Sequence, residues 1–181
     1  MEKWKLVSSK MAFDHKWFKV RQDTVQLPTG KLLDDFFVWL QGHVALVVPV
    51  TNDDKFVLVR QYKHGLGEIT VEFPAGMIDD GEDAYSAAIR ELGEETGYTS
   101  SDIQILGVQA SNPTKVVGDV HIFLATGVKK TQEQNFDSNE EIEVLIKSYD
   151  EVLALIDSGE MCTNGTISAF FLASRKLGLL K

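Results

Sequence analysis

The segment from about Asp83 to Glu95 carries the clearest helix pattern before the C-terminal region, and it constrains the fold more than any other stretch. Asp79 or Asp80 can cap its start, and Gly97 can end it in a left-handed conformation. One face presents small apolar side chains suited to close packing on a sheet: Ala84, Ala87, Ala88 and Leu92. We therefore expect one early helix that lies against a sheet.

Short strand patterns surround this helix on both sides along the chain. Leu27-Pro28-Thr29-Gly30 is a turn signal, and it predicts a hairpin between the first two strands. The expected strands are 17–27, 31–40, 44–50, 55–62, 69–73, 103–110, 121–128 and 141–147, and the expected closing helices are 150–158 and 166–176. Many strands around one early helix, with helices at the end, favour an α+β fold or a mixed-sheet sandwich over a regular βαβ repeat.

The longest uninterrupted apolar run, Val44–Val50, is far shorter than the ~20 residues that a membrane-spanning helix needs. The N-terminus lacks the apolar stretch of a signal peptide, and no membrane association is expected. Cys162 is the single cysteine, which excludes an internal disulfide framework and a multi-cysteine metal site. These features lead us to expect a cytoplasmic protein.

The charge balance limits the ligands that the chain can bind. Lys and Arg number 18 against 27 Asp and Glu, which gives a net charge of −9. Nucleic acid binding is not expected, because neutralising phosphates requires clustered basic residues. An anionic ligand would need a local divalent cation, a few focused basic residues, or both.

Three carboxylates share one face of the predicted helix. Glu91 is spaced i,i+3 from Glu94 and i,i+4 from Glu95, so like charges face one another and destabilise an isolated helix. A hard cation such as Mg²⁺ or Mn²⁺ offsets this repulsion, since both prefer carboxylate and water oxygens. The cluster alone also fits a solvated acidic helix without a ligand.

The spacing of the charged residues and glycines across 76–98 favours a metal site over a solvated acidic helix. The segment resembles the Nudix box, Gly-x5-Glu-x7-Arg-Glu-U-x-Glu-Glu-x-Gly-U, in which U is a bulky apolar residue. The matching residues are Gly76, Glu82, Arg90, Glu91, Leu92, Glu94, Glu95, Gly97 and Tyr98. Every fixed position matches, and Tyr98 is an aromatic residue where the motif usually has an aliphatic one.

The resemblance implies a Nudix fold, with a mixed sheet between helices, and a pyrophosphohydrolase activity that depends on Mg²⁺, with Mn²⁺ as a substitute. It also implies roles for residues: Glu91, Glu94 and Glu95 as metal ligands with the Ala75 carbonyl, and Arg90 as the partner of a box carboxylate. A carboxylate outside the box often serves as the general base in this family. Glu140 or Glu141 is the candidate, and a charged strand edge is the alternative.

Residues outside the box resemble ADP-ribose pyrophosphatases and related nucleotide-sugar hydrolases. The runs that contain Arg60, Gln61 and Glu72 match that group, as does Pro113 downstream of the box. The resemblance implies cleavage of ADP-ribose to AMP and ribose 5-phosphate, with these residues binding substrate. The loop 114–119 departs from the pattern, so GDP-mannose, other nucleoside diphosphate sugars or dinucleoside polyphosphates remain alternatives, as does a nucleotide-sensing module without catalysis.

The N-terminal strands are rich in aromatic residues, among them Trp17, Phe18 and Trp39. Core packing is the simplest interpretation of these side chains. The alternative is a dimer surface and an adenine-stacking platform, because relatives in this group exchange N-terminal strands and build the base pocket from two subunits. We therefore expect a homodimer, with a β-strand extension over 1–42 for dimerisation and base binding and a Nudix hydrolase domain over 43–181.

Overall fold

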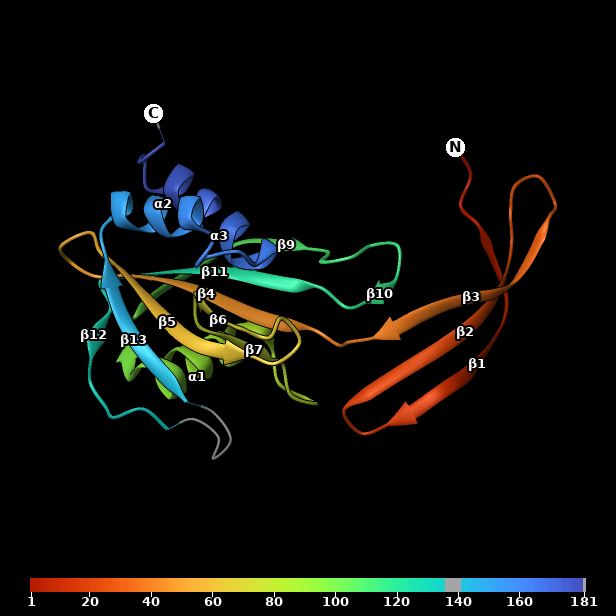
Figure 1. Cartoon of the computed structure of the whole chain (residues 1–181), viewed down its shortest axis with the longest axis horizontal. Coiled ribbons are helices and arrows are strands. Elements are labelled where there is room, and N and C mark those ends of the chain that lie inside the picture. The colour runs from red at the N-terminus through yellow and green to blue at the C-terminus, as the bar shows by residue number, and fades with distance from the viewer. Residues whose placement is uncertain (136–140, 181) are drawn as a thin grey trace. The chain divides into compact units, whose positions relative to one another are not determined.

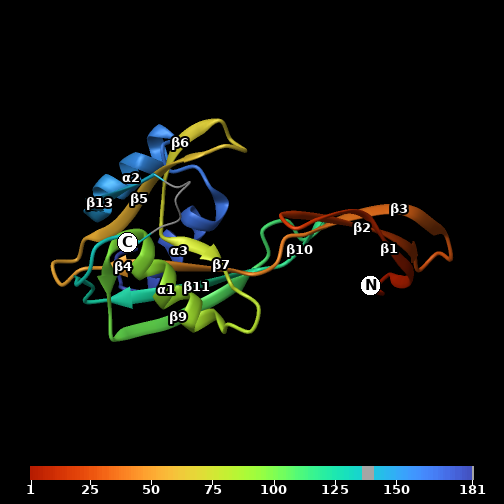
Figure 2. The ribbon, with the colours of Figure 1, turned by 90° about the horizontal axis from the view of Figure 1, so that it is seen from below.

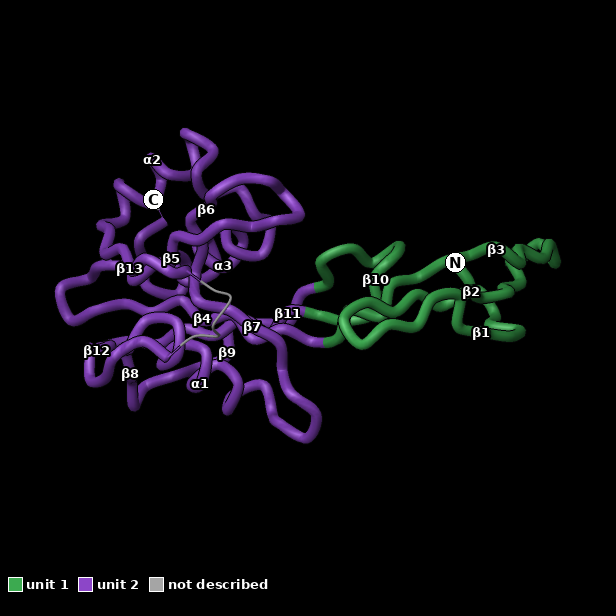
Figure 3. Tube along the Cα trace, turned by 60° about the horizontal axis from the view of Figure 1, so that its bottom comes forward, with its two compact units in different colours: residues 1–42, 110–119 green, residues 43–109, 120–181 purple. Residues whose placement is uncertain are grey.

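The computed structural model describes residues 1–135 and 141–180 (Figure 1). The chain divides into two compact units, one made of residues 1–42 and 110–119 and the other of 43–109 and 120–181 (Figure 3). The division places the loop 110–119, which contains Pro113, with the N-terminal strands.

The larger unit is built on one mixed sheet with the strand order β13-β5-β4-β11-β9. β11 runs parallel to β4, whereas the other pairings within this sheet, including β6 on β5 and β7 on β4, are antiparallel. The strands are β4 (Val44–Val50), β5 (Phe56–Lys63), β6 (Glu68–Glu72), β7 (Ala75–Met77), β9 (Asp102–Gln109), β11 (Val120–Thr126) and β13 (Ile142–Lys147). A separate short pair joins β8 (Tyr98–Thr99) to β12 (Lys129–Lys130).

Helices cover both faces of this sheet (Figures 1 and 2). On one face, α1 (Ala84–Thr96) packs its buried residues Ala87, Ala88 and Leu92 against alternate side chains of β4 and β5. On the other face, α2 (Tyr149–Ser158) and α3 (Asn164–Lys176) pack around Phe170. The predicted α+β Nudix architecture, a mixed sheet sandwiched between helices, is therefore confirmed, and so is the small-residue stripe.

Successive residues of β5 point into the two different helical layers. Phe56 and Leu58 enter the core under α2 and α3, whereas Val57 enters the core under α1. The strand is buried on both faces at its start and becomes exposed at Arg60. A central strand between two helical layers needs apolar residues on both faces, so strict alternation is lost there.

The start of α1 differs from the prediction. Asp83 is the N-cap: its carboxylate accepts hydrogen bonds from the backbone N–H groups of Tyr85 and Ser86. Asp79 belongs to the preceding turn, in which its carbonyl accepts a hydrogen bond from Glu82 N and Gly81 has a positive φ of 86°. The prediction of Asp79 or Asp80 as the cap was therefore wrong, whereas Gly97 ends the helix as expected.

The smaller unit is a four-stranded sheet of β1 (Lys5–His15), β2 (Phe18–Gln26), β3 (Leu32–Leu40) and β10 (Val116–Val117). The hairpin between β2 and β3 was predicted, but β1 was not. All eleven residues of β1 are exposed in the isolated chain, so no buried face gave its sequence an alternating pattern. None of the helices in the described part of the chain is long and apolar enough to span a membrane.

Candidate active site

The candidate site forms where β7 passes beneath α1 in the larger unit. β7 pairs with the start of β4, which places Gly76 opposite Ala45. A Cβ atom built on Gly76 would overlap the Glu91 carboxylate. Gly76 therefore lies in a strand, and its missing side chain leaves the space that Glu91 occupies.

Arg90 connects the carboxylates of the box. Its Nε and one terminal nitrogen donate to the two oxygens of Glu82, at 3.0 and 2.9 Å. The other terminal nitrogen donates to Glu91 at 2.6 Å and to Glu94 at 3.1 Å. A further bond, of 2.9 Å, reaches the Met77 carbonyl at the end of β7. The guanidinium therefore fixes two helix carboxylates relative to the strand.

Glu95 is held separately. Its Oε2 accepts a 3.1 Å hydrogen bond from the backbone N–H of Ala75, and only 4% of the residue is exposed. This contact orients the Ala75 peptide next to the helix. The structure thus brings together the two residues that the sequence suggested would share a cation, Glu95 and Ala75.

The electrostatics of this cluster fit a divalent cation. Glu82, Glu91, Glu94 and Glu95 bring four carboxylates together with the single guanidinium of Arg90. Glu91 and Glu95 are both buried, where an uncompensated charge is costly. A cation bound by carboxylate and carbonyl oxygens would relieve this excess, and these are the ligands that Mg²⁺ and Mn²⁺ prefer.

The Arg90–Glu82 ion pair links the loop before α1 to the helix. The bidentate contact from Arg90 holds the pKa of Glu82 below its usual range, and the same contact raises the pKa of Arg90. Glu82 also accepts a hydrogen bond from Asp79 N, which closes the loop before α1. Both groups therefore stay charged over the physiological pH range, and they tie the loop to the helix.

The predicted substrate-binding residues of the larger unit lie on β5 and β6. Arg60 is half exposed and forms a 2.6 Å ion pair with Glu143 on the neighbouring strand β13. Glu72 pairs with Lys63 at 3.0 Å, and Gln61 lies opposite Thr70 in the register of β5 and β6. Arg60 is thus already paired with a carboxylate, a contact that the sequence gave no reason to expect.

Of the two candidate bases, Glu141 is exposed and directly precedes β13. Glu140 lies outside the described residues. Trp17 and Pro113 belong to the smaller unit, and both are exposed. Trp17 lies in the turn between β1 and β2, 79% exposed, with the Lys16 ammonium 4.8 Å from its ring centroid.

The aromatic residues of the smaller unit do not form a buried core in the isolated chain. Phe18 stacks on Trp39 with ring centroids 5.3 Å apart, yet 45% of Phe18 is exposed. Core packing, the simpler interpretation of the sequence, was therefore wrong for Trp17 and Phe18. The same sheet leaves many further apolar side chains exposed: Trp4, Leu6, Val7, Met11, Phe13, Leu32 and Phe37.

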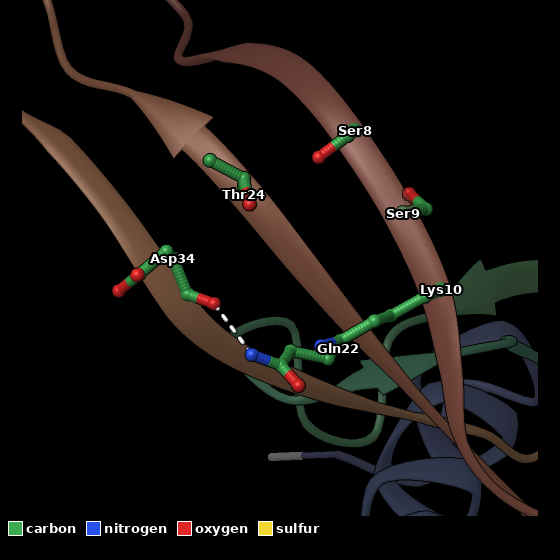
Figure 4. Close-up of a pocket in the computed structure, with 6 residues that line it drawn as sticks. All are labelled: Ser8, Ser9, Lys10, Gln22, Thr24 and Asp34. Carbon is green, nitrogen blue, oxygen red and sulfur yellow. Dashed lines mark hydrogen bonds between the residues drawn. The ribbon is translucent and has the colours of Figure 1, made fainter.

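A shallow hollow of about 250 Å³ lies on the β1-β2-β3 sheet (Figure 4). Its lining is polar and consists of Ser8, Ser9, Lys10, Gln22, Thr24 and Asp34. The Gln22 amide donates a 2.6 Å hydrogen bond to the Asp34 carbonyl across the strands. With one lysine and one aspartate, this lining lacks the carboxylate excess that marks the box cluster.

Sequence reasoning missed the residues that hold the C-terminal end of α1. A Cβ on Gly93 would lie 2.8 Å from the side-chain nitrogen of Gln132, and one on Gly97 would overlap the Gln132 carbonyl. Gln134 donates from its side chain to the Glu95 carbonyl. The motif leaves position 93 free, and the one signal was a glycine in a helix interior, where it costs about 1 kcal/mol relative to alanine.

Comparison with known proteins decides the family. The Nudix domain pattern matches residues 41–161, which includes the whole carboxylate cluster. The chain belongs to the Nudix family. A second pattern, the N-terminal domain of nucleoside diphosphate sugar hydrolases, matches residues 4–39. This Nudix protein is therefore a pyrophosphohydrolase of the nucleotide-sugar branch, and Nudix hydrolases generally use a divalent metal.

Individual relatives agree with this placement. An ADP-ribose pyrophosphatase of Bacillus subtilis is 32% identical, over 87% of this chain and 85% of the relative. A methanol dehydrogenase activator of Bacillus methanolicus is also 32% identical, over 91% and 89%. The crystal structure of an ADP compounds hydrolase superposes with a TM-score of 0.85 over 99% of this chain and 98% of the other, at 21% identity, which supports the fold.

Proposed function

We propose that this Nudix protein hydrolyses ADP-ribose to AMP and ribose 5-phosphate in a reaction that depends on Mg²⁺, for which Mn²⁺ can substitute. The observation that carries the proposal is the complete set of box carboxylates assembled around Arg90, with Glu95 fixed to the Ala75 peptide. The name of the Bacillus subtilis relative supports ADP-ribose as the substrate.

The roles of the site residues follow from this proposal. Glu91, Glu94 and Glu95, with the Ala75 carbonyl, would hold the metal. When bound, the metal neutralises the diphosphate and acidifies the attacking water. Arg90 keeps Glu91 and Glu94 in place through its two hydrogen bonds, so it acts by positioning.

The base is proposed to be Glu141 or Glu140, which would accept the proton of the attacking water. Water attacks one phosphorus, the P–O–P bridge opens, and the leaving phosphate oxygen keeps the bond electrons. Glu141 is exposed to solvent, so its side chain can approach a substrate phosphate. A carboxylate within reach of the attacking water is the type of group that acts as a general base.

Substrate contacts are proposed for Arg60, Gln61 and Glu72 in the larger unit. Arg60 suits a phosphate, because its planar guanidinium makes bidentate bonds to oxyanions. To do so it would exchange the Glu143 carboxylate for the substrate, which is feasible because both side chains of this pair are about half exposed. Trp17 and Pro113 are the proposed contacts from the smaller unit.

A panel of nucleotide sugars tests the proposed substrate. With Mg²⁺ present, ADP-ribose should release AMP with the highest kcat/KM, ahead of GDP-mannose, other nucleoside diphosphate sugars and dinucleoside polyphosphates. GMP released from GDP-mannose at a higher kcat/KM would assign the enzyme to GDP-mannose instead. Turnover of no compound, combined with tight binding of ADP-ribose, would make the protein a nucleotide sensor, a function closer to the name of the Bacillus methanolicus relative.

We propose that the protein is a homodimer in which residues 1–42 provide the interface and contribute to base binding. The support is the apolar surface of the β1-β2-β3 sheet, on which Trp4, Phe13 and Phe37 are among the side chains exposed in the isolated chain. Apolar side chains left exposed in such number often mark association sites. Light scattering at micromolar concentration should give about twice the 20.2 kDa mass of the chain. The monomer mass would contradict the dimer.

We further propose that the dimer acts in the cytoplasm. The single cysteine, Cys162, suits a reducing compartment, in which disulfides are rare. The net charge of −9 also supports the expectation that neither nucleic acid nor a membrane surface is a partner.

A further inference from the structure

Negative charge gathers at the C-terminal end of α1. Its last turn reads Gly93, Glu94, Glu95 and Thr96, so two carboxylates lie at the negative end of the helix dipole. The last carbonyls of a helix also have no partner within the helix and need donors from elsewhere. Two of the proposed metal ligands therefore lie where a helix most needs outside support.

The segment Lys129–Asn135, here called the α1 brace, supplies the donors. Its backbone N–H groups at Thr131 and Gln132 donate to the Gly97 carbonyl, at 3.0 and 3.2 Å. The N–H of Asn135 donates to the Glu94 carbonyl at 2.9 Å. The brace begins at β12, whose pairing with β8 fixes it next to the end of the helix.

Gln134 makes the most specific contact of the brace. Its side-chain nitrogen donates to the Glu95 carbonyl at 2.7 Å and to the Ile142 carbonyl, the first residue of β13, at 3.1 Å. Both acceptors are carbonyls, so the position needs an amide with two N–H groups. Glutamate has the same shape as glutamine but would face both carbonyls with a carboxylate.

Gly93 allows the brace to approach. A Cβ at this position would lie 2.8 Å from the Gln132 side-chain nitrogen, closer than carbon and nitrogen normally pack. The glycine weakens the helix interior, yet it gives Gln132 the room to lie on the last turn. The brace and the helix are therefore fitted to each other at Gly93 and at the Glu94 and Glu95 carbonyls.

We propose that Gln134 is a positioning residue for the metal-dependent reaction. Its side chain donates a hydrogen bond to the backbone carbonyl of Glu95, and the backbone N–H of Ala75 donates one to the Glu95 carboxylate. The backbone and the side chain of Glu95 are therefore both held in place. The same amide ties the last turn of α1 to β13, the strand that follows the candidate base Glu141. The inference rests on the proposed metal site, and it adds a residue outside the box that sets the geometry of the metal ligands.

Two variants separate this role from a general structural one. Gln134→Ala removes both donors without adding charge, and Gln134→Glu keeps the shape but loses the donors. Gln104→Glu on β9 is the matched control for the added charge, because Gln104 lies on a different strand and has no assigned role in the site. Circular dichroism at the assay temperature checks that each variant is folded.

Mn²⁺ binding to the full chain without substrate, followed by electron paramagnetic resonance, is the main readout. We expect the half-saturating Mn²⁺ concentration to rise at least fivefold in both Gln134 variants and to change less than twofold in Gln104→Glu. In the ADP-ribose assay, kcat should fall while KM for the nucleotide stays within twofold, since Gln134 contacts the helix and not the substrate.

Folded Gln134 variants that bind Mn²⁺ within twofold of the wild type would overturn the positioning role alone. Unchanged Mn²⁺ binding in Gln134→Ala, together with equal losses in Gln134→Glu and Gln104→Glu, would also overturn it, because the added charge and not the amide contact would then explain the effect. If the Gln134 variants do not fold, Gly93→Ala displaces Gln132 with every ligand intact and should weaken Mn²⁺ binding in the same direction. Unchanged binding there would contradict the brace. Wild-type protein without Mn²⁺ binding would overturn the proposed metal site itself.

Discussion

Glu95→Gln is expected to lower kcat at saturating Mg²⁺ at least a thousandfold, or roughly 4 kcal/mol of transition-state stabilisation. The change removes one charge from the metal cluster with almost no change in shape. The amide oxygen of glutamine can still accept the hydrogen bond from Ala75 N, and the helix loses one repulsive charge. The thermal midpoint should therefore stay at or above that of the wild type, while steady-state assays with ADP-ribose report the loss.

The matched control is Asp157→Asn, which likewise changes a carboxylate to an amide, in an exposed side chain near the end of α2 on the opposite face of the sheet. Its kcat should stay within twofold of the wild type. Glu95→Gln activity within tenfold of the wild type at saturating Mg²⁺ would exclude Glu95 as a metal ligand.

Gly76→Ala is expected to separate function from stability. The added methyl group overlaps the Glu91 carboxylate, which lies at the end of a flexible side chain and can move away at low cost to the fold. That movement displaces a proposed metal ligand and its bond to Arg90. Because misplacing a catalytic group by about 1 Å can cost a hundredfold, we expect kcat to fall about a hundredfold or more.

Gly107→Ala provides the comparison for Gly76→Ala. Gly107 lies in β9, and a Cβ built there meets nothing within 4 Å. Its activity and its half-saturating Mg²⁺ concentration should match those of the wild type. A Gly76→Ala enzyme with unchanged kcat and metal requirement would show that the position of the Glu91 carboxylate does not matter for turnover.

The box and its helix could be predicted because their signals are local. A terminating glycine and a stripe of alanines mark α1, and a fixed spacing of charges identifies the family. The core strands were also found, because a sheet between two helical layers leaves runs such as Val44–Val50 in the sequence. These features depend on neighbours within a few positions along the chain.

The features that were missed depend on residues distant in sequence. Gly93 had no explanation until Gln132, thirty-nine positions later, was found against it. The pairing of Arg60 with Glu143 requires the register of β5 and β13, which no local pattern encodes. β1 was missed because a strand that is exposed in the single chain has no buried face to impose a pattern on its sequence.

The most direct test of the account is the fate of oxygen from the solvent during hydrolysis of ADP-ribose in ¹⁸O-water with Mg²⁺. Carboxylates that place a metal on the diphosphate favour attack at a phosphorus of the P–O–P bridge, rather than cleavage of the ester bond between the diphosphate and C5 of the terminal ribose. With attack of water at phosphorus, we expect AMP and ribose 5-phosphate, with one ¹⁸O in the phosphate group of one of the two products. ADP and free ribose, which arise when the ester bond at C5 of the ribose is cleaved instead of the P–O–P bridge, would contradict it, whichever product carries the label.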